Sequence, residues 1–228
     1  MAATIHEKPR LPIENTGEQH LACAVLVDTS GSMRGYEQQL VEAITAMKEA
    51  IQDDDIARGR VEVCLITFDD DVREESPFGA ITKMEIPRIS CGGMTCTHAA
   101  IQFALQRVAE RKADYKQNHV TYNQPWIWLL TDGGSNDPDN GAFEELLRAQ
   151  RESKCVFFGV AVGDGVNEAE LGGMHKNGMI LRVGKDNLST VFDFISQSAS
   201  GASVNKPGDK LNVQVPNDME VKFIEIDV

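Results

Sequence analysis

The sequence predicts an α/β protein with a doubly wound, mainly parallel β-sheet flanked by helices, a Rossmann-like arrangement. Short apolar runs alternate with amphipathic stretches along the chain, which implies crossover helices between parallel strands. Two of the runs end in a carboxylate followed by a tight turn. With 228 residues, of which 42% are apolar, the chain is long enough for one sizeable core, and a second would be cramped.

The expected strands are short apolar runs, as in a sheet that is covered on both faces. In chain order they span 21–27, 61–68, 126–130, 155–162 and 179–183. The acidic triplet 69–71 ends the second run, and 72–75 is expected to return as a short antiparallel edge strand.

The expected helices are stretches in which apolar residues recur every three to four positions. They span about 36–52, 95–111, 142–152 and 188–198. In the first of them, Leu40, Ile44 and Met47 would line one face. Residues 76–90 have no clear periodicity beyond a short helix at their start.

The two ends of the chain differ in composition from the expected domain, which spans 19–200. Residues 1–18 form a polar lead-in that contains proline. Residues 201–228 are expected to be a linker and a tail with strand-like alternation. The tail either adds to a sheet edge or extends toward a partner.

The most informative motif is Asp28-Thr29-Ser30-Gly31-Ser32, which directly follows the first expected strand. A carboxylate and two hydroxyls stand at alternate positions, and Gly31 permits a tight turn between them. Oxygen atoms gathered where a strand ends and a helix begins suit a hard divalent cation.

Two further turns carry oxygen ligands. Gly92-Gly93-Met94-Thr95 opens an expected helix, and Thr131-Asp132-Gly133 follows the strand 126–130. In an open parallel sheet, the loops at the carboxyl ends of the strands gather in one crevice at the topological switch point. The residues expected to meet around one ion are Asp28, Ser30, Ser32, Thr95 and Asp132.

This combination resembles the metal-ion-dependent adhesion site (MIDAS) of von Willebrand factor A (VWA) domains, over residues 21–198. The resemblance implies that the two serines and the threonine contact the metal and that the aspartates act largely through water. The expected ion is Mg²⁺, with Mn²⁺ or Ca²⁺ as alternatives, and a partner's carboxylate would complete its coordination shell. The expected function is therefore protein binding without catalysis. The residues expected to contact the partner are Met33, Arg34, Tyr36 and Met94.

The residues within these motifs point to a narrower group of VWA proteins. The segments 26–33 and 129–133 are similar to those of bacterial TerY-like and YegL-like VWA proteins. This implies a tellurite-resistance or stress-response system and a kinase-like or phosphatase-like partner from the same gene cluster. Met94 is a departure, because these relatives commonly have Gly-Gly-Thr without an inserted residue.

Charge and composition argue against several classes of function. A net charge of −13 and a pI near 4.8 argue against nucleic acid or an anionic membrane as the partner. No apolar stretch is long enough to cross a bilayer, and the amino terminus lacks the apolar core of a signal peptide. The five cysteines have no paired spacing, which favours a reducing, cytoplasmic location.

Two rival functions stay open beside this interpretation. One is a phosphatase or phospho-acceptor enzyme that uses an Asp at a strand end, although a haloacid-dehalogenase-type enzyme needs a second carboxylate where Ser30 stands. The other is a structural subunit whose site has lost metal affinity. Zinc at Cys91, Cys96 and His98 is disfavoured, because their spacing matches no finger-like pattern.

Overall fold

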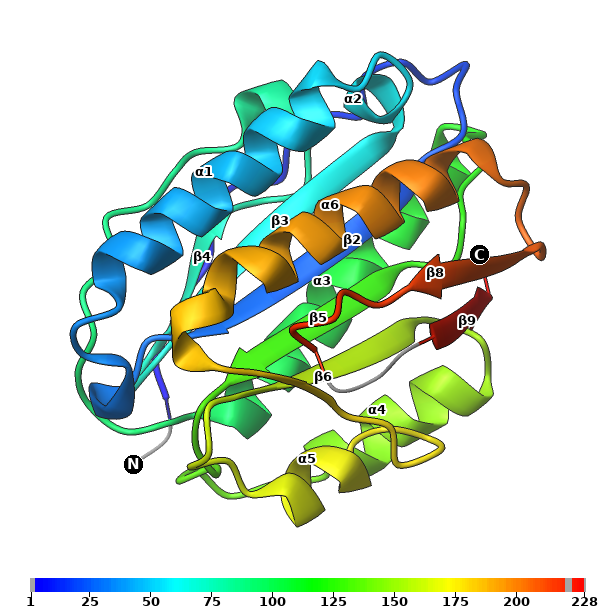
Figure 1. Ribbon diagram of the computed structural model, residues 1–228. Coiled ribbons are helices and arrows are strands. Elements are labelled where there is room, and N and C mark those ends of the chain that lie inside the picture. The colour runs from blue at the N-terminus through cyan, green and yellow to red at the C-terminus, as the bar shows by residue number, and fades with distance from the viewer. Residues whose placement is uncertain (1–2, 220–222, 228) are drawn as a thin grey trace.

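A seven-stranded sheet lies between two layers of helices in the computed structural model, which describes residues 3–219 and 223–227 (Figure 1). The order of the strands across the sheet is β1-β4-β3-β2-β5-β6-β7. Their bounds are β1 Ile5–His6, β2 Leu21–Asp28, β3 Val61–Phe68, β4 Val72–Ser76, β5 Trp126–Thr131, β6 Val156–Val162 and β7 Leu181–Val183.

Neighbouring strands are parallel except for β3 and β4, which are antiparallel. The predicted fold class is thus confirmed. The predicted antiparallel strand is present as β4, but it does not form the edge. Strand β1, from the polar lead-in, pairs parallel with β4 and places Ile5 opposite Val72.

The helices cover the two faces of the sheet. Helices α1 and α6 pack against one face, and α3 and α4 against the other (Figure 1). Their bounds are α1 Glu37–Asp53, α2 Ala57–Arg60, α3 Thr97–Gln117, α4 Ala142–Arg151, α5 Glu168–Gly173 and α6 Leu188–Val204. Single 3₁₀ turns are η1 Gly31–Met33, η2 Ile81–Lys83 and η3 Lys185–Asn187. None of the described helices is both long and apolar enough to span a membrane.

The central strand β2 shows why this sheet is made of continuous apolar runs. Successive side chains of a strand point to opposite faces. Val25 and Val27 therefore pack with α1 and α6, whereas Ala24 and Leu26 pack with α3 and α4. All eight residues of the strand are buried, so neither face tolerates polar side chains before the strand reaches its carboxyl end.

The carboxyl-terminal region differs from the linker that its composition predicts. Helix α6 continues to Val204, because Ala199 and Ala202 are fully buried in the core. Strands β8 (Lys210–Gln214) and β9 (Phe223–Asp227) then pair antiparallel with each other. The predicted tail thus forms its own small sheet. Its residues 220–222 and 228 lie outside the described part of the chain.

Candidate metal-binding site

The carboxyl edge of the sheet brings the three predicted turns together. Asp28 is the last residue of β2, and Asp132 directly follows β5, the neighbouring parallel strand. Thr95 lies in the loop that opens α3. The chain runs from β2 to β3 and β4 on one side and then crosses through α3 to β5 on the other side of β2, so this edge is the topological switch point that the sequence predicts.

Hydrogen bonds between main chains fix the first and second loops relative to each other. The amide of Gly31 donates to the carbonyl of Gly93 (3.1 Å), and the amide of Gly92 donates to the carbonyl of Thr29 (2.9 Å). Gly93 has a φ of 72°, and a Cβ there would lie 2.3 Å from Oδ2 of Asp70. The second glycine of the motif is therefore required both by its dihedral angle and by the close approach of Asp70.

The second and third loops are joined in the same way. The amide of Thr95 donates to Oδ1 of Asn136 (3.0 Å), and the amide of Asn136 donates to the carbonyl of Thr95 (2.8 Å). Oγ1 of Thr95 lies 3.9 Å from the position that a Cβ on Gly133 would take. The threonine hydroxyl is thus held beside the third loop.

Side chains of the first and third loops form a continuous chain of oxygen atoms. The hydroxyls of Ser30 and Ser32 lie 3.1 Å apart, and that of Ser32 donates to Oδ1 of Asp132 (2.6 Å). Asp28 accepts hydrogen bonds from the Ser30 amide (2.8 Å) and from the Thr131 hydroxyl (2.6 Å). Hydroxyl and carboxylate oxygens together are the donor set that a hard divalent cation prefers.

The two aspartates are almost completely buried, with Asp28 1% and Asp132 3% exposed. Burial raises the pKa of Asp28; hydrogen bonds from Thr131 and Ser30 oppose this rise, and the nearby charge of Asp132 adds to it. Negative charge is therefore concentrated where water solvates it poorly. A cation at this edge would relieve both the desolvation and the mutual repulsion.

One cationic side chain that sequence reasoning missed reaches this site. Nζ of Lys185, in the turn after β7, donates to Oδ2 of Asp132 and to the carbonyl of Ser32 (2.9 Å). It also lies 5.4 Å from the centre of the Tyr36 ring. No local motif marks this lysine, because its approach depends on β7 following β6 in the sheet.

The predicted partner-contact residues divide into two groups. Met33 is 2% exposed and packs in the core beneath α1 and α6, so its prediction as a contact residue is wrong. The 3₁₀ turn that follows Ser30 directs this side chain inward. Arg34 and Met94 are exposed, and Tyr36 is half-buried under Lys185.

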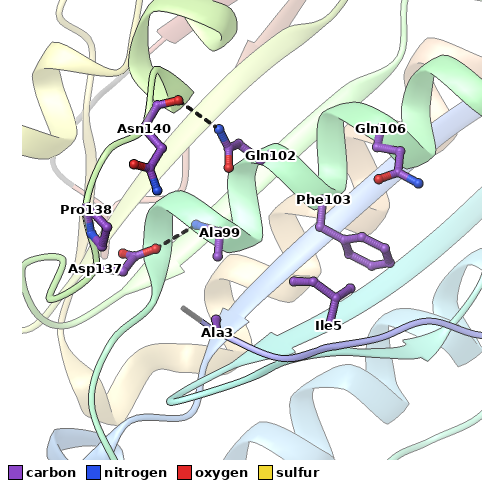
Figure 2. A pocket seen from close by; sticks show the side chains of 9 residues that line it. All are labelled: Ala3, Ile5, Ala99, Gln102, Phe103, Gln106, Asp137, Pro138 and Asn140. Atoms are coloured by element: carbon purple, nitrogen blue, oxygen red, sulfur yellow. Dashed lines mark hydrogen bonds between the residues drawn. The ribbon is translucent and has the colours of Figure 1, made fainter. Parts of the chain in front are cut away.

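An acidic residue of the β5–α4 loop caps α3 from outside the site. The carboxylate of Asp137 accepts hydrogen bonds from the amides of His98 (3.2 Å) and Ala99 (2.8 Å), and Figure 2 shows the second of these bonds. The pocket drawn there continues over Ile5 and Phe103 and contains none of the five predicted ligands. Asp137 thus supports the position of α3, and the pocket is separate from the oxygen cluster.

The disfavoured zinc alternative gains no support. Among the described side chains, no group of three or more His, Cys, Asp or Glu residues is placed to hold a metal ion. Sγ of Cys96 lies 3.5 Å from the carbonyl of Asp70, and Nδ1 of His98 lies 2.8 Å from that of Asp137. The oxygen cluster differs in kind, because three of its five predicted ligands are hydroxyls.

Comparison with known proteins agrees with this geometry. Residues 23–197 match the von Willebrand factor type A domain family. The chain belongs to this family. No curated protein sequence matches it significantly.

Solved structures with the same VWA fold come from distant sources. One is proximal thread matrix protein 1 from the mussel byssus, described with a zinc-occupied MIDAS motif (19% identity, TM-score 0.57, covering 80% of this chain and 46% of that one). Another is the ArnB paralog VWA2 from Sulfolobus acidocaldarius (19%, 0.53, 79% and 45%). A third is the pilus adhesin SpaC from Lactobacillus rhamnosus GG (11%, 0.62, 84% and 31%). The chain spans less than half the length of these proteins, and at such identities the likeness concerns the fold of the VWA domain.

Proposed function

We propose that this VWA domain binds a divalent cation, Mg²⁺, and uses it to bind an acidic residue of a protein partner. The observation that carries the proposal is the chain of oxygens from Ser30 through Ser32 to Asp132, joined to the loop of Thr95 by hydrogen bonds. Together with Thr95, these residues come from three separate loops at one edge of the sheet. That is the arrangement that the sequence motifs predict for a MIDAS.

The surroundings of each residue suggest its role. Ser30, Ser32 and Thr95 present neutral hydroxyls, which bind an ion without neutralising it. Both carboxylate oxygens of Asp28 already accept internal hydrogen bonds, so this residue would orient the first loop and act on the ion indirectly. A bound Mg²⁺ would supply surplus positive charge for a partner's carboxylate. The mussel protein described with a zinc-occupied MIDAS motif supports metal binding by the corresponding motif here.

The same contacts argue for binding over catalysis. A phospho-acceptor or phosphatase would need a carboxylate free to attack phosphorus. Asp28 is 1% exposed and holds donors from Ser30 and Thr131 on its two oxygens. The non-enzymatic function is therefore the one that this geometry favours.

The finer assignment concerns the biological setting. We propose a cytoplasmic protein of the TerY-like or YegL-like kind, in a tellurite-resistance or stress-response system, with a kinase-like or phosphatase-like partner. The residues at 26–33 and 129–133 support the assignment to the TerY-like or YegL-like group. The five cysteines are all buried free thiols, which is typical of a reducing compartment.

Calorimetric titration with MgCl₂ tests the metal site. We expect the wild type to bind Mg²⁺ and the Asp28→Asn and Thr95→Val variants to lose binding. Asp164→Asn is the matched control, because this exposed acid lies in the neighbouring loop after β6. Equal Mg²⁺ binding by the wild type and Asp28→Asn would contradict the proposal.

The partner's role is tested separately by affinity capture from the native cells. Partner protein should be recovered in Mg²⁺, lost with chelator, and lost again with Ser30→Ala. A partner retained under all three conditions would show that recognition does not use the ion.

A further inference from the structure

We propose that Lys185 is an internal cation that occupies the acidic end of this site in the metal-free protein and competes with the divalent cation for Asp132. The inference rests on the proposed metal site and goes beyond it. It assigns a residue outside the motif a part in setting the affinity for the ion.

The contacts of the ammonium group are with residues of the proposed metal site itself. It donates to Oδ2 of Asp132 and to the main-chain carbonyl of Ser32 (2.9 Å), while the hydroxyl of Ser32 satisfies the other oxygen of Asp132 (2.6 Å). Both oxygens of Asp132 are thus engaged within the protein. A divalent ion that draws on Asp132, directly or through water, has to take the place of at least one of these donors.

The position of Lys185 is built into the fold. The lysine stem passes over Gly163, where a Cβ would lie 3.0 Å from Cγ of Lys185 and where φ is 72°. The amide of Gly163 donates to the carbonyl of Val183 (2.7 Å), which holds the loops after β6 and β7 together. Nζ also lies over the Tyr36 ring at 5.4 Å, within the range of a cation–π interaction.

For electrostatic reasons, the ammonium of Lys185 and the divalent ion do not occupy the site together. An ammonium and a divalent ion a few ångströms apart repel each other, and in a poorly solvated site this repulsion is screened only weakly. In the metal-free protein the lysine offsets the charge of two buried carboxylates. Metal binding then releases the ammonium from Asp132, so the lysine weakens the apparent affinity for the ion while stabilising the metal-free state.

The test compares Mg²⁺ binding by wild type and Lys185→Met in calorimetric titration. We expect the dissociation constant to fall at least tenfold in the variant. Arg34→Gln is the matched control, because Arg34 is a cation near the site whose Nε donates to the carbonyl of Cys91. Its effect should stay below about threefold, since it removes a nearby charge without freeing a metal ligand.

Thermal unfolding supplies a second readout besides direct titration of the ion. Lys185→Met should lower Tm in chelator, because Asp132 loses its counter-charge. Saturating Mg²⁺ should abolish most of this difference, since the wild-type lysine has then left Asp132. This is a thermodynamic cycle between the side chain and the ion.

Each remaining outcome has a distinct meaning. Equal affinities for Mg²⁺, with the same Tm difference in chelator and in Mg²⁺, would overturn the competition and leave the proposed metal site intact. Weaker binding by Lys185→Met, or an equal effect of Arg34→Gln, would also overturn it. If neither the wild type nor Lys185→Met binds Mg²⁺, the proposed function itself fails, and this inference fails with it.

Discussion

Among the residues that the structure describes, buried carboxylates occur in two regions, and they are held in different ways. On the α3 face of the sheet, Glu62 and Glu74 are paired with arginines of that helix. At the carboxyl edge, Asp28 and Asp132 are held by hydroxyls, one amide and a single lysine. All four acids are at most 3% exposed, so burial alone does not distinguish them.

The α3 region pairs each of its two buried acids with a guanidinium. Nε of Arg111 donates to Oε2 of Glu62 (2.6 Å), and Nη2 of Arg111 donates to Oε1 (2.5 Å). This is the bidentate geometry that suits a carboxylate. Burial would raise the pKa of Glu62, but His20, whose Nδ1 lies 3.4 Å from the carboxylate, and the hydrogen bonds and charge of Arg111 lower it to about 2. At the edge, in contrast, burial raises the pKa of Asp28. The comparison separates acids that hold the fold together from acids kept available to a cation.

The largest expected effect comes from breaking the pair on α3. Arg111→Met leaves Glu62 buried without its counter-charge, which costs about 3–5 kcal/mol of unfolding free energy. Urea unfolding measures this loss, and Arg58→Met, in an exposed pair with Asp55, should cost less than about 1 kcal/mol. A loss under about 1 kcal/mol for Arg111→Met would remove the distinction between the two regions.

Lowering the pH should remove the stabilisation that the Glu62–Arg111 pair provides. Because the pKa of Glu62 is lower in the folded state, its ionised form stabilises the protein above the unfolded value, and this stability is lost as pH falls from 4.5 toward about 2. The advantage of the wild type over Glu62→Gln should shrink by about 3 kcal/mol across that interval. Chemical unfolding at a series of pH values measures it, and a constant difference would contradict the assignment.

A smaller effect is expected at the carboxyl edge of the sheet. Asp28→Asn relieves the burial of a charge while weakening the bonds from Ser30 and Thr131, so the metal-free stability should change by less than about 1 kcal/mol. The same variant should lose Mg²⁺ binding. A loss of 3 kcal/mol or more in chelator would place Asp28 with the structural acids of α3.

The sequence is sufficient to predict that the loops of the five candidate ligands gather at one edge of the sheet, because each residue lies at a strand end or before a helix and a parallel sheet brings such loops together. It is insufficient for Lys185, whose approach to Asp132 depends on the order of β6 and β7 across the sheet. Burial explains two further positions at which the structure differs from the sequence-based prediction. Met33 follows Ser32 directly but turns into the core, and Ala202 lies in a stretch whose composition predicts a linker. Local patterns do not encode which of these side chains the packed helices cover.

The smallest effect on stability is expected at the exposed rim of the site. Met94 is 54% exposed in the second loop, so Met94→Ala should change the unfolding free energy by less than about 0.5 kcal/mol and leave Mg²⁺ affinity unchanged. It should nevertheless reduce the amount of partner recovered in Mg²⁺, because an exposed apolar side chain beside the ion can pack against a bound protein. Val204→Ala is the matched control, since this residue is 53% exposed at the far end of α6. Equal recovery with both variants would show that the partner contacts the ion without contacting the second loop.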